Sequence, residues 1–261
     1  MLVDVHNHFT YYNEDIDRAL VDMAENQMLM VSVSTDFESY EDTLKVAKQS
    51  EQILPAFGVH PIMAHKNTNK LELIRKMADD ALVLGEIGLD KLWIEEQSHF
   101  PPQLPLLDVF LESANKGDKV VILHVAGAES EVLEKLETHS VRRAIIHDYY
   151  GPVNLADKII EADLFFAFDR SYLEEYKPEV QGWEERLQIA SMIPDDRFLI
   201  ETDGPNKPPR KMPFEALQIV AERIAELRNS TPEEIHAQST RNFKNLIAGS
   251  PKLDQYFDLL R

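Results

Sequence analysis

Seven polar residues of this sequence stand at or just beyond the ends of short apolar runs, and all belong to types that bind metal ions. They are Asp4, His6, His8, Glu86, His124, His147 and Asp203. Imidazole nitrogens and carboxylate oxygens suit Zn²⁺, Mn²⁺ and related divalent cations. Because the sequence contains no cysteine, thiolate metal sites and cysteine nucleophiles are excluded. The pattern therefore indicates a metal centre built from nitrogen and oxygen donors.

The first of these segments is Asp4-Val5-His6-Asn7-His8. Side chains alternate along an extended strand, so Asp4, His6 and His8 are expected to share one face. Two imidazoles at this spacing can chelate one metal ion, while Asp4 accepts a ring N–H without touching the metal. Two surface histidines are the alternative, and the apolar strand before them favours the metal site.

Glu86 lies in the segment Gly85-Glu86-Ile87-Gly88-Leu89-Asp90. Burying a carboxylate directly after an apolar strand is costly unless a partner neutralises its charge. A salt bridge at the rim of the fold would do so, and so would two metal ions bridged by the two carboxylate oxygens. Four histidines with a bridging Glu86 and Asp203 as base suit two divalent cations about 3.5–4 Å apart, which convert a shared water into a hydroxide nucleophile. Glu86 and Asp203 are therefore the candidate catalytic carboxylates.

Apolar runs alternate with amphipathic stretches along the whole chain. The predicted strands are Leu2–Val5, Met28–Val33, Ile53–Gly58, Leu82–Gly85, Lys119–Leu123, Ala144–Ile146, Leu164–Phe168 and Phe198–Ile200. The predicted helices are Ile16–Glu25, Tyr40–Gln49, Leu71–Met77, Leu107–Ala114, Glu129–Leu136, Glu174–Ser191, Pro213–Leu227 and a last helix with a start signal at 230–234 that runs to Ile247.

This alternation predicts an α/β fold, a (β/α)₈ TIM barrel with extra C-terminal helices, formed by residues 1–261 as a single domain. An open doubly wound sheet is the alternative. It would spread the polar strand ends along an edge, whereas a barrel brings the carboxyl ends of all its strands to one face. A shared site therefore favours the barrel.

The composition narrows the classes of function. The chain has 261 residues, 44% of them hydrophobic, and a formal net charge of −19. A field of that sign repels nucleic acid, so a polyanionic substrate needs local basic residues or bound cations. No apolar run approaches the roughly 18 residues of a membrane span, and the first residues leave no room for a secretory leader, so we expect a cytoplasmic protein without membrane contact. Phosphate-loop, nucleophile-elbow and dinucleotide-binding glycine motifs are all missing from the sequence.

Taken in order, the motifs resemble those of the TatD family of metal-dependent deoxyribonucleases and hydrolases, within the amidohydrolase superfamily of barrels. The resemblance spans nearly the whole chain. It rests on 3–9 (VDVHNHF), 58–61 (GVHP), 85–90 (GEIGLD), His124, His147, 201–205 (ETDGP) and 239–242 (STRN).

The resemblance implies that His6 and His8 bind one metal ion together with Asp203, and that Glu86 bridges to a second ion. It implies that His124 and His147 bind this second ion, and that His60 helps to hold a phosphate. Asp203 would also accept the proton of the attacking water. Family members cleave phosphodiesters of DNA, often from a 3′ end, with Mg²⁺, Mn²⁺ or Zn²⁺.

Several positions depart from the family pattern. Ile62 stands where a second histidine usually follows Gly-x-His-Pro, and Val125-Ala126-Gly127 lacks the arginine that usually lies near a phosphate. The stretch 148–151 (DYYG) and Gly204 replace other family residues. The metal ligands are kept while substrate-contacting positions are changed, so the resemblance implies the metal chemistry more strongly than the DNA substrate.

Basic and aromatic residues near the predicted site are candidates for binding substrate. Lys91 follows the Gly-Leu-Asp turn, and the loop after Asp203 carries Lys207, Arg210 and Lys211, which we expect to hold a phosphate beside the metals. A solvated loop is the alternative. The aromatic candidates for stacking on a base are Trp93, Tyr149 and Tyr150, with packing as the alternative.

The sequence therefore predicts a two-metal phosphodiesterase that acts on DNA ends or nucleotides, as a 3′-to-5′ deoxyribonuclease. An amidohydrolase or lactonase acting on a small neutral molecule is the second reading. A non-catalytic partner module on the same barrel is the third. The sequence leaves the identity of the metals and the oligomeric state open.

Overall fold

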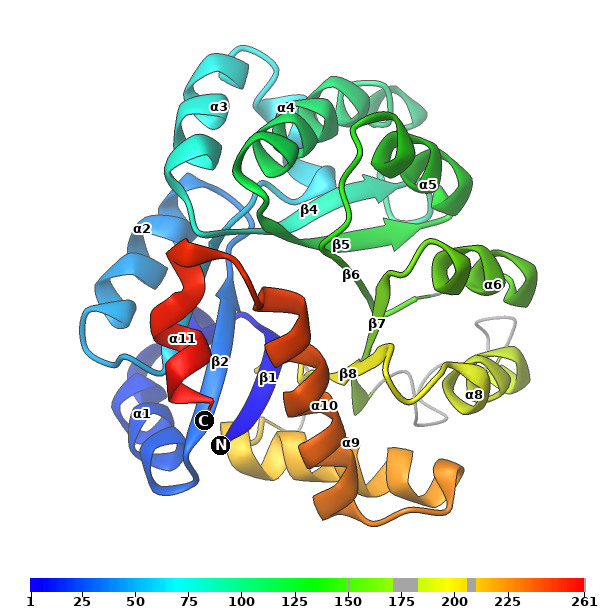
Figure 1. Ribbon diagram of the computed structural model, residues 1–261. Coiled ribbons are helices and arrows are strands. Elements are labelled where there is room, and N and C mark those ends of the chain that lie inside the picture. Colours follow the sequence, from blue (N-terminus) through cyan, green and yellow to red (C-terminus); the bar gives the residue numbers. More distant parts are fainter. Residues whose placement is uncertain (150, 171–182, 206–209, 261) are drawn as a thin grey trace.

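The structure, a computed structural model, describes residues 1–149, 151–170, 183–205 and 210–260. Its strands form one parallel sheet in the order β1 to β8, and helices surround the ring of strands (Figure 1). The strands are β1 Leu2–Asn7, β2 Met28–Val33, β3 Ile53–Phe57, β4 Val83–Asp90, β5 Val120–Ala126, β6 Ala144–His147, β7 Phe165–Phe168 and β8 Phe198–Ile200. The predicted (β/α)₈ barrel is confirmed.

Helices connect successive strands and continue beyond β8. They are α1 Ile16–Glu25, α2 Phe37–Ala47, α3 Leu71–Asp80, α4 Gln103–Gly117, α5 Glu129–Thr138, α6 Val153–Glu161, α8 Trp183–Met192, α9 Pro213–Arg228, α10 Pro232–Ile247 and α11 Asp254–Leu259. The predicted start of α10 is confirmed, since Thr231 and Glu234 form a capping box. Helices α6 and α11, of nine and six residues, are not among the helices predicted from the sequence. Part of the predicted helix Glu174–Ser191 lies outside the described residues.

Four strands, β1, β4, β5 and β6, extend beyond their predicted ends, and β4 and β5 do so by the most. The prediction that Glu86 and His124 follow their strands is therefore wrong. β4 continues to Asp90 and β5 to Ala126, which places both side chains inside paired strands. The pairing shifts register between Leu84 and Ile87 and then continues. Gly88 permits this, because it has φ +148° and a Cβ there would lie 1.9 Å from the carbonyl oxygen of His124.

The interior of the barrel is apolar below the polar strand ends. Its cluster contains side chains such as Val3, Leu29 and Ile122 together with Phe243 of α10 and Tyr256 of α11. In Figure 1, α10 and α11 lie across the opening at which the chain begins. These two helices close the amino-terminal end of the barrel, so polar chemistry is confined to the opposite end.

The seam between β1 and β8 is closed by backbone bonds at one end and by side chains at the other. Near the polar end, the N–H of His8 donates to the oxygen of Gly204 over 2.8 Å, and the N–H of Asp203 donates to the oxygen of His6 over 3.0 Å. At the other end, α10 pairs with the backbone of β8. The N–H of Ile200 donates to Ser239 Oγ over 3.1 Å, and Asn242 Nδ2 donates to the oxygen of Phe198 over 2.7 Å. The late 239–242 motif thus completes the hydrogen bonding of a strand edge.

Candidate metal centre

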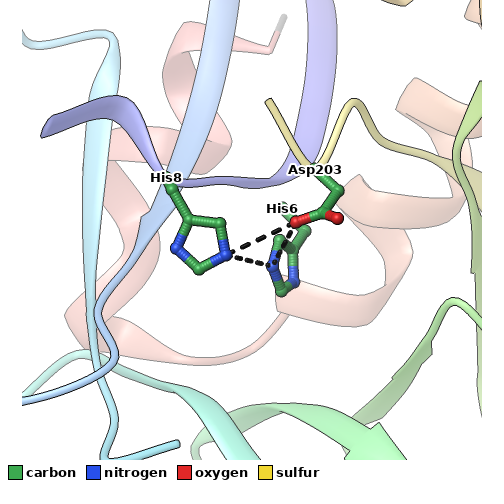
Figure 2. A group of neighbouring side chains, drawn as sticks. All are labelled: His6, His8 and Asp203. Carbon is green, nitrogen blue, oxygen red and sulfur yellow. Dashed lines mark hydrogen bonds and ion pairs between the residues drawn. The ribbon is translucent and has the colours of Figure 1, made fainter. Parts of the chain in front are cut away.

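The first group of candidate metal ligands lies at the seam of the barrel, where the end of β1 meets the segment after β8. His6 and His8 come from β1 and the residue after it, and Asp203 follows β8 (Figure 2). The Nε2 atoms of the two histidines lie 3.4 Å apart. Asp203 Oδ1 lies 3.6 Å from His6 Nε2 and 3.4 Å from His8 Nε2. Donors bound to one tetrahedral ion at about 2.1 Å are separated by about 3.4 Å, so this trio matches the shape of a metal site.

Asp4 fixes the backbone on which this trio stands. Its Oδ1 accepts the N–H of His6 over 3.2 Å and the N–H of Thr202 over 3.0 Å. Its Oδ2 accepts the Thr202 hydroxyl over 2.6 Å. Burial raises the pKa of Asp4 to about 7. Asp4 was expected to accept the N–H of a histidine ring. Its contacts instead tie β1 to the segment that carries Asp203.

Glu86 lies between two sets of histidines, with one oxygen toward each. Its Oε2 is 3.4 Å from His8 Nε2 and 3.7 Å from His6 Nε2. Its Oε1 is 2.9 Å from His124 Nδ1 and 4.0 Å from His147 Nε2. A carboxylate placed in this way can bridge two cations.

The backbone at Glu86 is held by close approach of β3 and the end of β2. The N–H of Glu86 donates to the oxygen of Ser34 over 2.9 Å. A Cβ at Gly58 would lie 2.3 Å from both N and O of Glu86, so only glycine fits at this contact. This close contact therefore explains why the Gly58-Val59-His60-Pro61 segment begins with glycine.

Two further carboxylates, which the sequence analysis did not single out, orient the histidines of the second set. Asp90 Oδ2 lies 3.1 Å from His124 Nε2, and Glu201 Oε1 contacts His147 Nδ1. Both carboxylates are fully buried. A carboxylate oxygen accepts hydrogen bonds, so these contacts favour a proton on His124 Nε2 and on His147 Nδ1. The lone pairs of His124 Nδ1 and His147 Nε2 are then left for a metal ion.

His60, which was expected to help to hold a phosphate, lies beside Glu86. Its Nε2 is 3.3 Å from Glu86 Oε1, and with His124 these residues form a third group whose geometry can hold an ion. Its Nδ1, however, accepts the N–H of Ile62 over 3.3 Å, which favours a proton on Nε2. This tautomer makes His60 a hydrogen-bond donor to Glu86 rather than a metal ligand.

The histidines and carboxylates of the site perturb one another strongly. Burial opposes protonation of His8, but Asp203 and Glu86 outweigh it and raise the His8 pKa to about 9. Burial is likewise outweighed at His124, where Asp90 and Glu86 raise the pKa to about 9. At His147, Glu201 raises the pKa to about 10 against burial. The protein thus concentrates negative charge here, and that charge attracts cations.

Burial raises the pKa of Glu86 less than the surrounding histidines lower it. His60, His124 and His8 together hold the pKa of this carboxyl well below its usual range. Glu86 is therefore ionised at any pH at which the protein works. An ionised, buried carboxylate with an oxygen toward each set of histidines is a strong anchor for divalent cations.

The expected basic residues near the site are paired with acids where the structure describes them. Lys91 contacts Glu131, and Lys211 contacts Glu215. Arg210 is 41% exposed and its Nη1 lies 4.0 Å from Asp15 Oδ2. Lys207 lies outside the described residues. Binding of a phosphate by Arg210 and Lys207 therefore stays a prediction.

The expectation that Tyr149 stacks on substrate is wrong. Tyr149 is fully buried, its hydroxyl donates to the oxygen of Pro152 over 2.8 Å, and its ring packs edge-on against Phe166. The apolar layer between barrel and helices accounts for this burial. Tyr150 lies outside the described residues, whereas Trp93 is 42% exposed.

A family model described as TatD related DNase matches residues 3–248. This chain belongs to the TatD-related DNase family. It is a metal-dependent hydrolase of that family. The sequence-based resemblance to TatD proteins is thus confirmed.

Similar proteins extend over the full length of the chain. The metal-dependent hydrolase YabD of Bacillus subtilis is 27% identical, covering 95% of this chain and 99% of its own. The human protein named deoxyribonuclease TATDN3 is 24% identical, covering 97% of this chain and 95% of its own. The crystal structure of the TatD homologue YjjV from Escherichia coli superposes with a TM-score of 0.81 at 23% identity, covering 94% of this chain and 97% of that one. The last comparison supports the barrel fold.

Within the described ranges, no helix has the length and apolar character needed to cross a bilayer. The cytoplasmic location expected from the sequence stays a prediction.

Proposed function

We propose that this TatD-family hydrolase uses two divalent cations to cleave phosphodiesters of DNA ends or nucleotides, as a 3′-to-5′ deoxyribonuclease. The observation that carries the proposal is Glu86, whose two oxygens face two different sets of histidines. A site for one ion would need only one of these sets. Ester hydrolysis across a pair of cations is the chemistry that such a bridge serves.

We assign His6, His8 and Asp203 to the first ion and His124 and His147 to the second, with Glu86 shared. The inferred tautomers support the second assignment, because Asp90 and Glu201 take the other ring N–H of each histidine. His60 remains outside both sets, and its single N–H, on Nε2, donates to Glu86 or, once substrate binds, to a phosphate oxygen. Mg²⁺, Mn²⁺ and Zn²⁺ are all compatible with these donors.

Bound cations would supply a hydroxide at neutral pH and neutralise charge on the ester. Asp203 is best placed to receive the proton of the attacking water. Its side chain is 17% exposed, compared with 4% for Glu86, so it is the more accessible of the two carboxylates. Its backbone has φ +46°, a region that aspartate tolerates better than most residues and that turns its carboxylate toward the histidines. Asp203 then returns the proton to the leaving oxygen.

Binding of divalent cations is expected to release about three protons per chain at pH 7. His8, His124 and His147 have pKa values raised to about 9, 9 and 10, so each is protonated at pH 7 before a cation binds. Each must lose one proton to present a lone pair. Apparent affinity for Zn²⁺ therefore rises as pH increases from 7 to 9 and falls as pH decreases.

Calorimetric titration with Zn²⁺ in buffers of different ionisation enthalpy measures this proton release. An affinity that is constant from pH 7 to pH 9, with no buffer dependence of the heat, contradicts the assignment of these histidines as ligands. The Glu201→Gln variant provides a further comparison, because the substitution removes the carboxylate that faces His147.

The direct test of function uses the purified chain loaded with Mn²⁺, Zn²⁺ or Mg²⁺. Single-stranded oligonucleotides labelled at the 5′ end are expected to shorten stepwise from the 3′ end. Bis-p-nitrophenyl phosphate is expected to be hydrolysed as well. Absence of both reactions with every metal refutes the proposal, and elemental analysis showing no bound metal would favour a non-catalytic barrel.

A second candidate is hydrolysis of a small neutral amide or lactone. The observation in its favour is that the described basic side chains Lys91 and Lys211 are paired with glutamates. These two lysines therefore offer little positive charge to a polyanionic substrate. A panel of lactones and amides assayed beside the oligonucleotides separates the two. Faster turnover of a lactone than of any phosphodiester would select the second candidate.

A further inference from the structure

Two exposed aromatic side chains lie against the candidate metal centre, and we call them the aromatic pair, Tyr11 and Trp93. They are 36% and 42% exposed. The Tyr11 ring stacks on His8, with centroids 5.3 Å apart and planes at 12°. The Trp93 ring meets His124 edge-on, with centroids 5.7 Å apart. Each ring thus adjoins a histidine of a different metal set.

The backbone that carries Trp93 is tied directly to the second set. Asp90 Oδ1 accepts the N–H of Leu92 and the N–H of Trp93, each over 2.8 Å. Its other oxygen contacts His124 Nε2. One buried carboxylate therefore fixes both an imidazole of the metal centre and the turn that presents an aromatic ring beside it.

Tyr11 is held in a comparable way on the first set. Its N–H donates to the oxygen of His8 over 2.9 Å, and its hydroxyl lies 3.3 Å from Thr35 Oγ1. Both rings are thus positioned before substrate arrives, so little conformational freedom is lost when a ligand stacks on them.

The two described lysines near the site are both paired with glutamates, so they contribute little to binding of an anionic substrate. Lys91 and Lys211 are engaged by Glu131 and Glu215, and the chain carries a net charge of −19. Stacking of a base on an aromatic face needs no charge and tolerates any base. Recognition beyond the reacting ester is therefore expected to depend on planar groups.

We infer that Tyr11 and Trp93 are specificity-determining residues that stack on planar rings on the two sides of the reacting ester. The inference rests on the proposed function and names its substrate class: a phosphodiester between two unpaired nucleosides. Bases paired in a duplex have their faces covered by neighbours and cannot stack in this way.

The test compares thymidylyl-thymidine with the same compound lacking one base, using the Mn²⁺-loaded enzyme. Trp93→Ala and Tyr11→Ala are each expected to raise KM for the complete dinucleotide about 5- to 100-fold, with a much smaller change in kcat. Neither is expected to change KM for the analogue that lacks the base stacked on that residue. Trp93→Phe is expected to retain most of the wild-type KM, because it keeps an aromatic face.

Leu73→Ala is the matched control, since Leu73 is 49% exposed on α3. Equal KM values for the dinucleotide and both of its base-lacking analogues in the wild type would overturn the inference while leaving phosphodiester hydrolysis intact. Failure of the wild type to hydrolyse either compound would refute the proposed function instead.

Binding without turnover gives a second readout. Trp93 is one of two tryptophans in the chain, so a Trp183→Phe variant reports on Trp93 alone. Thymidine 5′-monophosphate is expected to quench its fluorescence, and ribose 5-phosphate is not. Equal quenching by both compounds would show that Trp93 senses the phosphate and not a base, which overturns the stacking role.

Discussion

A Glu86→Gln variant is expected to bind fewer than two divalent cations per chain and to lose about 10⁴-fold in kcat. The amide has the shape of the carboxylate but only one acceptor oxygen, so it cannot serve both sets of histidines. The NH₂ group would also point toward His8 or His124, each of which lies within 3.4 Å of a Glu86 oxygen. Metal content by elemental analysis and kcat on bis-p-nitrophenyl phosphate measure the two effects.

Glu134→Gln is the matched control, because Glu134 is exposed on α5. It is expected to keep two cations and full activity. A Glu86→Gln protein that retains two cations and turns over at the wild-type rate would show that Glu86 does not bridge. Far-ultraviolet circular dichroism spectra typical of the folded protein in both variants exclude unfolding of the barrel as the cause of lost metal binding and activity.

Asp203→Asn is expected to abolish turnover, with a fall in kcat of at least about 10³-fold, while the protein stays folded. Asparagine tolerates the left-handed backbone that Asp203 adopts at φ +46°, so the local chain path is preserved. What is lost is the proton acceptor and one charged ligand of the first ion. Single-turnover assays at saturating Mn²⁺ separate the loss of the base from a loss of metal affinity.

The comparison variant is Asp157→Asn, on the exposed side of α6. It should leave kcat and metal binding unchanged. Asp203→Asn with normal turnover at saturating metal would remove Asp203 as the base, and a different proton acceptor would then have to be sought. Turnover restored by a higher Mn²⁺ concentration alone would point instead to a role in metal binding.

The positions of the strands could be predicted because strands buried on both faces are short apolar runs. β2 and α1 have the predicted bounds. The ends of β4 and β5 could not be predicted, since they run on through polar residues whose charge is balanced only by residues distant in sequence. Glu86 looks like the end of a strand until its partners are known.

The candidate ligands of the centre could be identified from the sequence, but the contacts between these ligands and their neighbours could not. Asp90 stands four residues after Glu86 on the same face of β4, and Glu201 stands two residues before Asp203, directly after β8. That spacing was an available signal for both orienting carboxylates. The approach of His60 to Glu86 had no such signal, because it depends on how closely β3 and β4 pack at Gly58.

The seam of the barrel has a consequence for the order in which the centre is assembled. His124 and His147 come from neighbouring strands that follow Glu86 along the chain, and the contact between His124 and Glu86 spans 38 positions. The first set instead requires residue 4 to meet residue 202, a separation of 198 positions. Contacts that close so long a loop form late, and during synthesis they wait for the last strand to leave the ribosome. His124, His147 and Glu86 can thus come together before β8 is made, whereas the first set and the contact of Glu201 with His147 are completed last.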